Sequence, residues 1–97
     1  MFMETSRVLY RLQRSKERLF QKYALKSMAL FGSYARNEAR NESDIDILVE
    51  FNKPVGFEFI DLAVELEEML EHKVDLVSKK GVKPQMLPFI EKDLIYV

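Results

Sequence analysis

The segment from Asp44 to Phe51 constrains the fold most strongly, because its side chains alternate in character over the length of a complete strand. Successive side chains of a strand point to opposite faces of the sheet. One face therefore carries Ile45, Ile47 and Val49, and the other carries Asp44, Asp46, Leu48 and Glu50. Both faces are apolar beyond the carboxylates, which predicts a central strand that is covered on both sides.

The rest of the chain alternates between helical and strand-like patterns. Amphipathic periodicity predicts helices over residues 3–23 and 56–72, with Thr5 or Ser6 as the N-cap of the first. Short apolar runs predict strands over 26–31 and 73–78. This order predicts the α/β (α+β) class.

Shorter elements fill the remaining segments. A helix is expected to begin near Ser33 and continue to Glu38, and a second is expected from Pro84 to Ile90, with Pro88 limiting its length. The last five residues, 93–97, predict either an edge strand or an extended tail.

The composition limits the classes of protein to consider. A chain of 97 residues is expected to form one domain, with an N-terminal helix over residues 1–25 and a core over 26–97. It contains no cysteine, which excludes disulfides and thiolate metal sites, and no apolar run approaches the roughly 20 residues of a membrane span. The net charge of −1 argues against a general nucleic-acid-binding protein. We therefore expect a cytoplasmic protein without a membrane partner.

Charge is unevenly distributed over the two long predicted helices. Residues 1–26 contain seven basic and two acidic residues, whereas residues 56–71 contain six acidic and no basic residues. The basic stripe on the first helix is either a solvated face or a docking surface for an acidic partner or RNA.

Three aspartates suggest a metal site. Asp44 and Asp46 are two residues apart, so their carboxylates share one face of the strand and repel each other unless a cation lies between them. Oxygen ligands favour Mg²⁺ or Mn²⁺ over Zn²⁺. Asp75 interrupts a second apolar strand, and it completes a three-carboxylate cluster if the two strands are neighbours. The alternatives are strand-start caps for the pair, and an exposed edge position beside a lysine for Asp75.

The turn at Gly32–Ser33 is the candidate phosphate site. Glycine allows a close approach of the backbone to an oxyanion, and the Ser33 hydroxyl can donate to a phosphate oxygen. Neither GxxxxGK[ST] nor GxGxxG is present, so the P-loop and Rossmann folds lack their motifs. Arg36 is placed either to neutralise phosphate or to pair with a local carboxylate. His72 is the only histidine, and we interpret it as a residue at a helix C-terminus.

The order and spacing of these motifs resemble those of a known family. Gly32–Ser33, ten intervening residues, Asp44-x-Asp46 and a later lone Asp75 are similar to the DNA polymerase β-like nucleotidyltransferase superfamily. The stretch GSYARNEARNESDIDILVEF resembles its minimal nucleotidyltransferase branch, the MntA-type antitoxins of HEPN/MNT toxin–antitoxin pairs.

This resemblance implies a small mixed β-sheet flanked by helices and an ATP-dependent activity. It implies that Asp44, Asp46 and Asp75 are catalytic and hold two Mg²⁺ ions. The predicted nucleotide-binding residues are Gly32, Ser33, Arg36 and Ser43. Asn37 departs from the family pattern, in which glycine usually follows Ala-Arg, and this change is expected to tighten or alter the turn near the phosphates.

The resemblance also implies the acceptor. MntA-type proteins adenylylate a tyrosine of a partner HEPN ribonuclease and so silence it. Because larger relatives carry a second, acceptor-binding domain for which this chain leaves no residues, we expect a partner protein to bring the acceptor in a hetero-oligomer. The alternatives are a non-catalytic antitoxin that acts by steric binding, and a nucleotidyltransferase subunit for a small-molecule acceptor.

Overall fold

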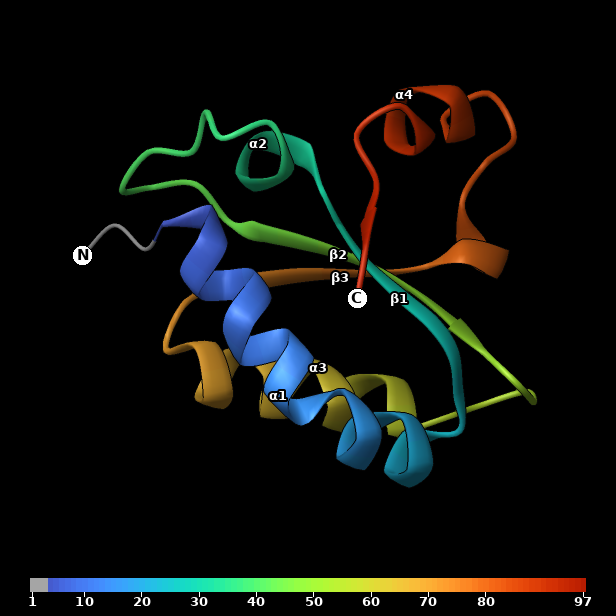
Figure 1. The fold of residues 1–97 in the computed structure, drawn as a ribbon. Helices are drawn as coiled ribbons and strands as arrows, with labels where there is room; N and C mark the ends of the chain where they lie inside the picture. Colours follow the sequence, from blue (N-terminus) through green and yellow to red (C-terminus); the bar gives the residue numbers. More distant parts are fainter. Residues whose placement is uncertain (1–3) are drawn as a thin grey trace.

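Four strands form one mixed sheet in the order β3-β2-β1-β4 in the computed structural model, which describes residues 4–97 (Figure 1). The longer strands β1 (Leu25–Phe31) and β2 (Ile45–Phe51) are antiparallel, and β1 also pairs antiparallel with β4 (Ile95–Tyr96). Only β2 and β3 (Val74–Ser78) are parallel. This sheet with its helices confirms the predicted α/β class.

The helices lie on both faces of the sheet (Figure 1). The two long helices, α1 (Thr5–Tyr23) and α3 (Glu58–Leu70), lie together against one face. The short helices α2 (Gly32–Ala35) and α4 (Leu87–Glu91) lie on the opposite side, and a 3₁₀ turn, η1 (Lys79–Gly81), follows β3. One face of the sheet is therefore more open than the other.

The core lies between the sheet and the two long helices. Ile45, Ile47 and Val49 are completely buried on this side of β2, and Leu48 on the other side is 4% exposed. Both observations confirm β2 as a central strand with apolar residues on each face. The helices contribute Val8, Leu12, Leu19, Leu62, Leu66 and Leu70, all fully buried.

Helix α1 begins differently from the prediction. Glu4 occupies the N-cap position without a side-chain cap, so the expected capping by Thr5 or Ser6 is wrong. The Thr5 hydroxyl instead donates a hydrogen bond of 2.6 Å to the carbonyl oxygen of Tyr34, which joins α1 to α2. The predicted start at Met3 falls outside the described residues.

The C-terminal elements correct one prediction and confirm another. Helix α4 begins at Leu87 rather than at Pro84, and Pro88 lies in its first turn, where its missing N–H would have had no helical acceptor. Pro88 therefore starts the helix instead of limiting it. The predicted edge strand exists as β4, and the N–H of Val97 donates to the carbonyl of Met28 at 3.0 Å.

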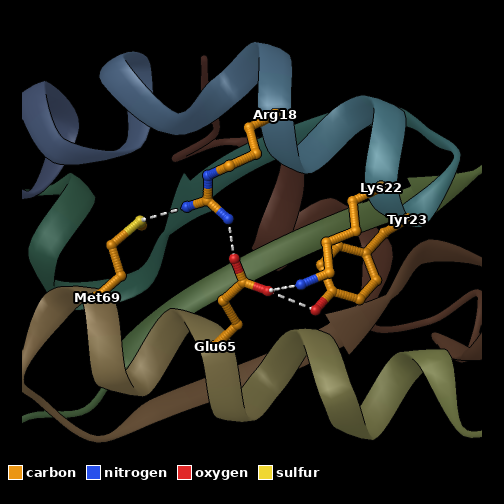
Figure 2. A network of polar contacts seen from close by, with 5 residues as sticks. All are labelled: Arg18, Lys22, Tyr23, Glu65 and Met69. Atoms are coloured by element: carbon orange, nitrogen blue, oxygen red, sulfur yellow. Dashed lines mark hydrogen bonds and ion pairs between the residues drawn. The ribbon is translucent and has the colours of Figure 1, made fainter.

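The charged stripes of the two long helices face each other in part. Glu65 of α3 accepts hydrogen bonds from Tyr23 Oη at 2.6 Å and Lys22 Nζ at 2.9 Å, and it also pairs with Arg18 (Figure 2). Arg11 lies 3.5 Å from the Glu71 carboxylate. Part of the basic stripe therefore holds α1 against α3. Within residues 4–97, no helix is both long and apolar enough to cross a membrane.

Candidate active site

Gly32 forms the turn at which β1 ends. Its φ is +74°, which L side chains rarely adopt. A Cβ placed on residue 32 would lie 2.1 Å from Asp46 Oδ2, so any side chain here would collide with that carboxylate. Glycine thus allows the turn to approach Asp46, and Ser33 follows in the single turn of α2.

Asp46 and Asp75 are direct neighbours in the parallel ladder between β2 and β3. Residues paired in this way point to the same face of the sheet, which here is the face opposite α1 and α3. Burial, followed by the charge of Asp75 and a hydrogen bond with it, raises the pKa of Asp46 to about 6. The sheet therefore brings together two of the three predicted catalytic carboxylates.

Asp44 lies farther out than the other two aspartates. It is exposed, it precedes the first residue of β2, and its charge contributes less to the raised pKa of Asp46 than the charge of Asp75 does. Among residues 4–97, no three carboxylate, imidazole or thiol groups converge closely enough to hold a metal ion. The three-carboxylate cluster thus remains a prediction.

Arg36 follows α2 and pairs with local carboxylates. Its Nε donates to Glu38 at 2.7 Å, and a terminal nitrogen donates to Asp93 Oδ2 at 2.8 Å. Its positive charge also opposes the rise in the pKa of Asp46. Arg36 therefore lies close enough to influence the aspartates electrostatically while it binds the segment between α4 and β4.

Asn37 adopts a left-handed conformation with a φ of +59°. Asparagine tolerates this conformation better than most non-glycine residues. Its Oδ1 atom also lies 3.3 Å from the Thr5 hydroxyl. Asn37 thus adopts a backbone conformation that glycine would also allow, so its presence leaves the turn after α2 intact.

Ser43 lies in a turn, and its backbone carbonyl is bound by His72. Its Oγ accepts a hydrogen bond from the backbone N–H of Arg40 at 2.9 Å. His72 Nε2 lies 2.6 Å from the carbonyl oxygen of Ser43 and donates to it, and the His72 ring makes an edge contact with buried Tyr34. The Ser43 side chain therefore shapes the loop that leads to Asp44.

The contact between His72 and Ser43 was not expected from the sequence. The prediction that His72 ends a helix is confirmed, because its N–H donates to the Glu67 carbonyl just beyond α3. The contact between His72 and Ser43 can be inferred only when the pairing of β2 with β3 is known. Ile45 pairs with Val74, so the residues two positions earlier, Ser43 and His72, come side by side.

Comparison with known proteins identifies the family to which this chain belongs. The model of the nucleotidyltransferase domain family matches residues 12–97. A Methanocaldococcus jannaschii protein, provisionally named a protein adenylyltransferase, is 51% identical over 90 residues, which cover 89% of this chain and 90% of that protein. The chain belongs to the nucleotidyltransferase family.

Other nucleotidyltransferases match along most of their length. The protein adenylyltransferase MntA of Thermococcus cleftensis is 37% identical over 83 residues, or 84% of each chain. A solved structure, provisionally described as a minimal nucleotidyltransferase, superposes with a TM-score of 0.84 at 30% identity and covers 96% of this chain and 95% of that one. These matches confirm the resemblance and the mixed-sheet fold.

One more distant structure shares the fold of this nucleotidyltransferase. It is a complex of a tri-AMPylated HEPN toxin of Shewanella oneidensis with an MNT antitoxin. The TM-score is 0.68 at 22% identity, with 92% of this chain and 70% of that chain covered. At this identity the likeness extends to the fold alone.

Proposed function

We propose that this nucleotidyltransferase transfers AMP from ATP to a hydroxyl group, that of a tyrosine, on a partner HEPN-type toxin and thereby silences it. One observation carries the proposal: Asp46 and Asp75 are paired in the ladder beside the Gly32 turn. The names of the M. jannaschii and T. cleftensis relatives support adenylyl transfer, and the S. oneidensis complex supports a HEPN partner.

The carboxylates suit a divalent cation. Asp46 and Asp75 are neighbouring oxygen ligands, and their mutual repulsion contributes to the raised pKa of Asp46. Mg²⁺ prefers such ligands, with Mn²⁺ as the alternative. We assign Asp44, Asp46 and Asp75 to two ions. When bound, these ions would supply positive charge to the transferring phosphoryl group and the leaving pyrophosphate.

The chain's own residues would bind and orient the reactants. The Gly32 turn and the Ser33 hydroxyl would hold the triphosphate, with Arg36 and Ser43 completing the nucleotide-binding set. Since Asp75 is exposed, its carboxylate is open to an incoming acceptor and would take the proton of the acceptor hydroxyl.

The transfer itself is a displacement at phosphorus. The acceptor oxygen forms a new bond to the α-phosphorus of ATP, and the bond from that phosphorus to the oxygen bridging the β-phosphate breaks. Pyrophosphate leaves with the electron pair. We assign the reaction to the core over residues 26–97 and treat residues 1–25 as its supporting helix within one domain.

The experiment is label transfer from ATP labelled at the α-phosphate. The purified protein is incubated with the labelled ATP, Mg²⁺ and a nuclease-inactive HEPN partner. With the wild-type protein, the partner is expected to become labelled and to gain the mass of one or more AMP groups. Asp46→Asn and Asp75→Asn are each expected to lower the rate at least about a hundredfold, a typical contribution of an acid–base or charge-stabilising group.

Asp61→Asn is the matched control, because Asp61 is an exposed aspartate in the first turn of α3, on the other face of the sheet. It is expected to retain wild-type transfer. Transfer that persists in Asp46→Asn would contradict the catalytic assignment. In a parallel assay with the active HEPN nuclease, a partner that is neutralised without being modified would favour steric binding. AMP on a small hydroxylated compound alone would favour a small-molecule acceptor.

A further inference from the structure

A cavity of about 560 Å³ opens beyond the ends of β2 and β3. It is lined by residues 50–55, which include the end of β2 and the loop after it, and by residues 78–80, at the start of η1. Asp46 and Asp75 lie near the opposite ends of these two strands. The cavity is therefore distinct from the site already described.

The cavity is predominantly basic. Lys53, Lys79 and Lys80 line it together with one acidic residue, Glu50. Lys79 Nζ lies 3.8 Å from the Glu50 carboxylate, which Lys26 also approaches at 3.8 Å from outside the cavity. No ion pair within residues 4–97 involves Lys53 or Lys80. Lys53 lies close enough to Glu58 to lower the pKa of that carboxyl, but both lysines are exposed, so their two positive charges are available to an anionic ligand.

Glu50, which lines the cavity, lies on the same face of the sheet as the catalytic aspartates. Glu50 is four residues beyond Asp46 on β2, so the two side chains point to the same face. A strand rises about 3.3 Å per residue, which places them roughly 13 Å apart. The triphosphate of ATP is assigned to the Gly32 turn, at the Asp46 end. The lysines are thus free for a different anion.

We infer that this lysine-lined cavity docks an acidic segment of the protein acceptor, an inference that rests on the proposed function. The carboxylates of that segment would pair with Lys53 and Lys80, and the apolar lining from Phe51, Pro54 and Val55 would receive a neighbouring apolar side chain. An extended peptide also advances about 3.3 Å per residue, so the acidic residues lie about four positions from the modified hydroxyl.

The test uses the double variant Lys53→Ala/Lys80→Ala with the nuclease-inactive HEPN partner. The KM for the partner is expected to rise about tenfold, the effect of losing two partly exposed ion pairs, while the KM for ATP and the melting temperature stay the same. Binding of the partner, measured by calorimetry without ATP, is expected to weaken by the same factor and to depend less on salt.

Arg7→Ala/Arg14→Ala is the matched control, because it removes two positive charges from exposed positions of α1, on the other face of the sheet. It is expected to leave partner binding unchanged. If this control weakens binding and the lysine variant does not, α1 is the docking surface and the cavity is excluded.

The two proposals fail in different ways. If the wild-type protein binds the partner but transfers no AMP, the proposed function fails, and the effect of the lysine variant on binding still tests the cavity. If wild-type transfer occurs and the lysine variant keeps the same KM for the partner, only the cavity proposal fails. The cavity proposal would also be overturned if the double lysine variant lost binding to a short RNA and still bound the partner.

Discussion

Gly32 approaches Asp46 so closely that a Cβ on residue 32 would lie 2.1 Å from Asp46 Oδ2. The relationship places the predicted phosphate turn directly beside the predicted metal site. Two features therefore favour glycine at residue 32: the lack of space beside Asp46, and the φ of +74°, which disfavours any residue with a side chain.

Gly32→Ala is expected to lower the free energy of unfolding by about 1–2 kcal/mol from the backbone conformation alone, with a further loss from the collision with Asp46. AMP transfer is expected to fall with it. Urea denaturation measures the first effect, and Gly56→Ala and Gly81→Ala are matched controls because a Cβ at either position meets nothing within 4 Å. In an Asp46→Ala background the cost of Gly32→Ala should be smaller, and equal costs in both backgrounds would contradict the contact.

Glu65→Gln is expected to lower the free energy of unfolding by roughly 1–3 kcal/mol, because the side chain accepts hydrogen bonds from two cations and a phenol (Figure 2). The Glu65 side chain is only 21% exposed, so water replaces these bonds poorly. Chemical denaturation at neutral pH measures the change. Glu68→Gln, on an exposed position of the same helix, should change stability by less than about 0.5 kcal/mol, and equal losses would remove the network as the cause.

The same network predicts a pH dependence. The Tyr23 hydrogen bond, with the cations Arg18 and Lys22, lowers the pKa of Glu65 from 4.5 to about 2. A carboxyl whose pKa is lowered by folding stabilises the protein above its unfolded pKa and loses this contribution as the pH falls through the folded pKa. The stability difference between wild type and Glu65→Gln should therefore be constant above about pH 5 and shrink towards pH 2. A difference that does not change with pH would contradict the shift.

His72→Ala is expected to loosen the loop before β2. Its Nε2 bond to the Ser43 carbonyl and its contact with Tyr34 would be lost, at a cost of about 1–2 kcal/mol. Amide hydrogen exchange over residues 40–44 should become faster than in wild type, and transfer should fall because Asp44 follows this loop. Lys73→Ala changes the adjacent exposed residue and should leave this exchange unaltered. Unchanged protection in His72→Ala would exclude the positioning role.

Arg36 and Asp93 are expected to be energetically coupled. Arg36→Ala and Asp93→Ala should each destabilise the protein slightly in urea denaturation, and the double variant should lose less stability than the sum of the two, because both remove the same ion pair. The KM for ATP should rise in Arg36→Ala and stay near wild type in Asp93→Ala if Arg36 binds the nucleotide. An equal rise in the KM for ATP in both variants would show that the loss of the Arg36–Asp93 ion pair is responsible. Arg36 would then no longer be assigned to the nucleotide site.

The sequence by itself determined the elements and the residues that carry the chemistry. The alternation over 44–51, the helical periodicity and the Gly-Ser and Asp-x-Asp spacing are local properties of the chain, and they specified the α/β class, the central strand and the family. The helix starts differed from the predictions for two reasons. The Thr5 hydroxyl bonds to the distant Tyr34 instead of capping α1, and Pro88 lies in the first turn of α4, where its missing N–H has no helical acceptor.

Only the tertiary structure decided which residues meet. The parallel pairing of β2 with β3 placed Asp75 beside Asp46, and this pairing also aligned His72 with Ser43. The packing of α1 against α3 brought Arg18 and Lys22 of the basic stripe to Glu65 of the acidic stripe, where they form a hydrogen-bonded network. Strand order and helix packing depend on contacts between segments far apart in sequence, so no local pattern of residues encodes them.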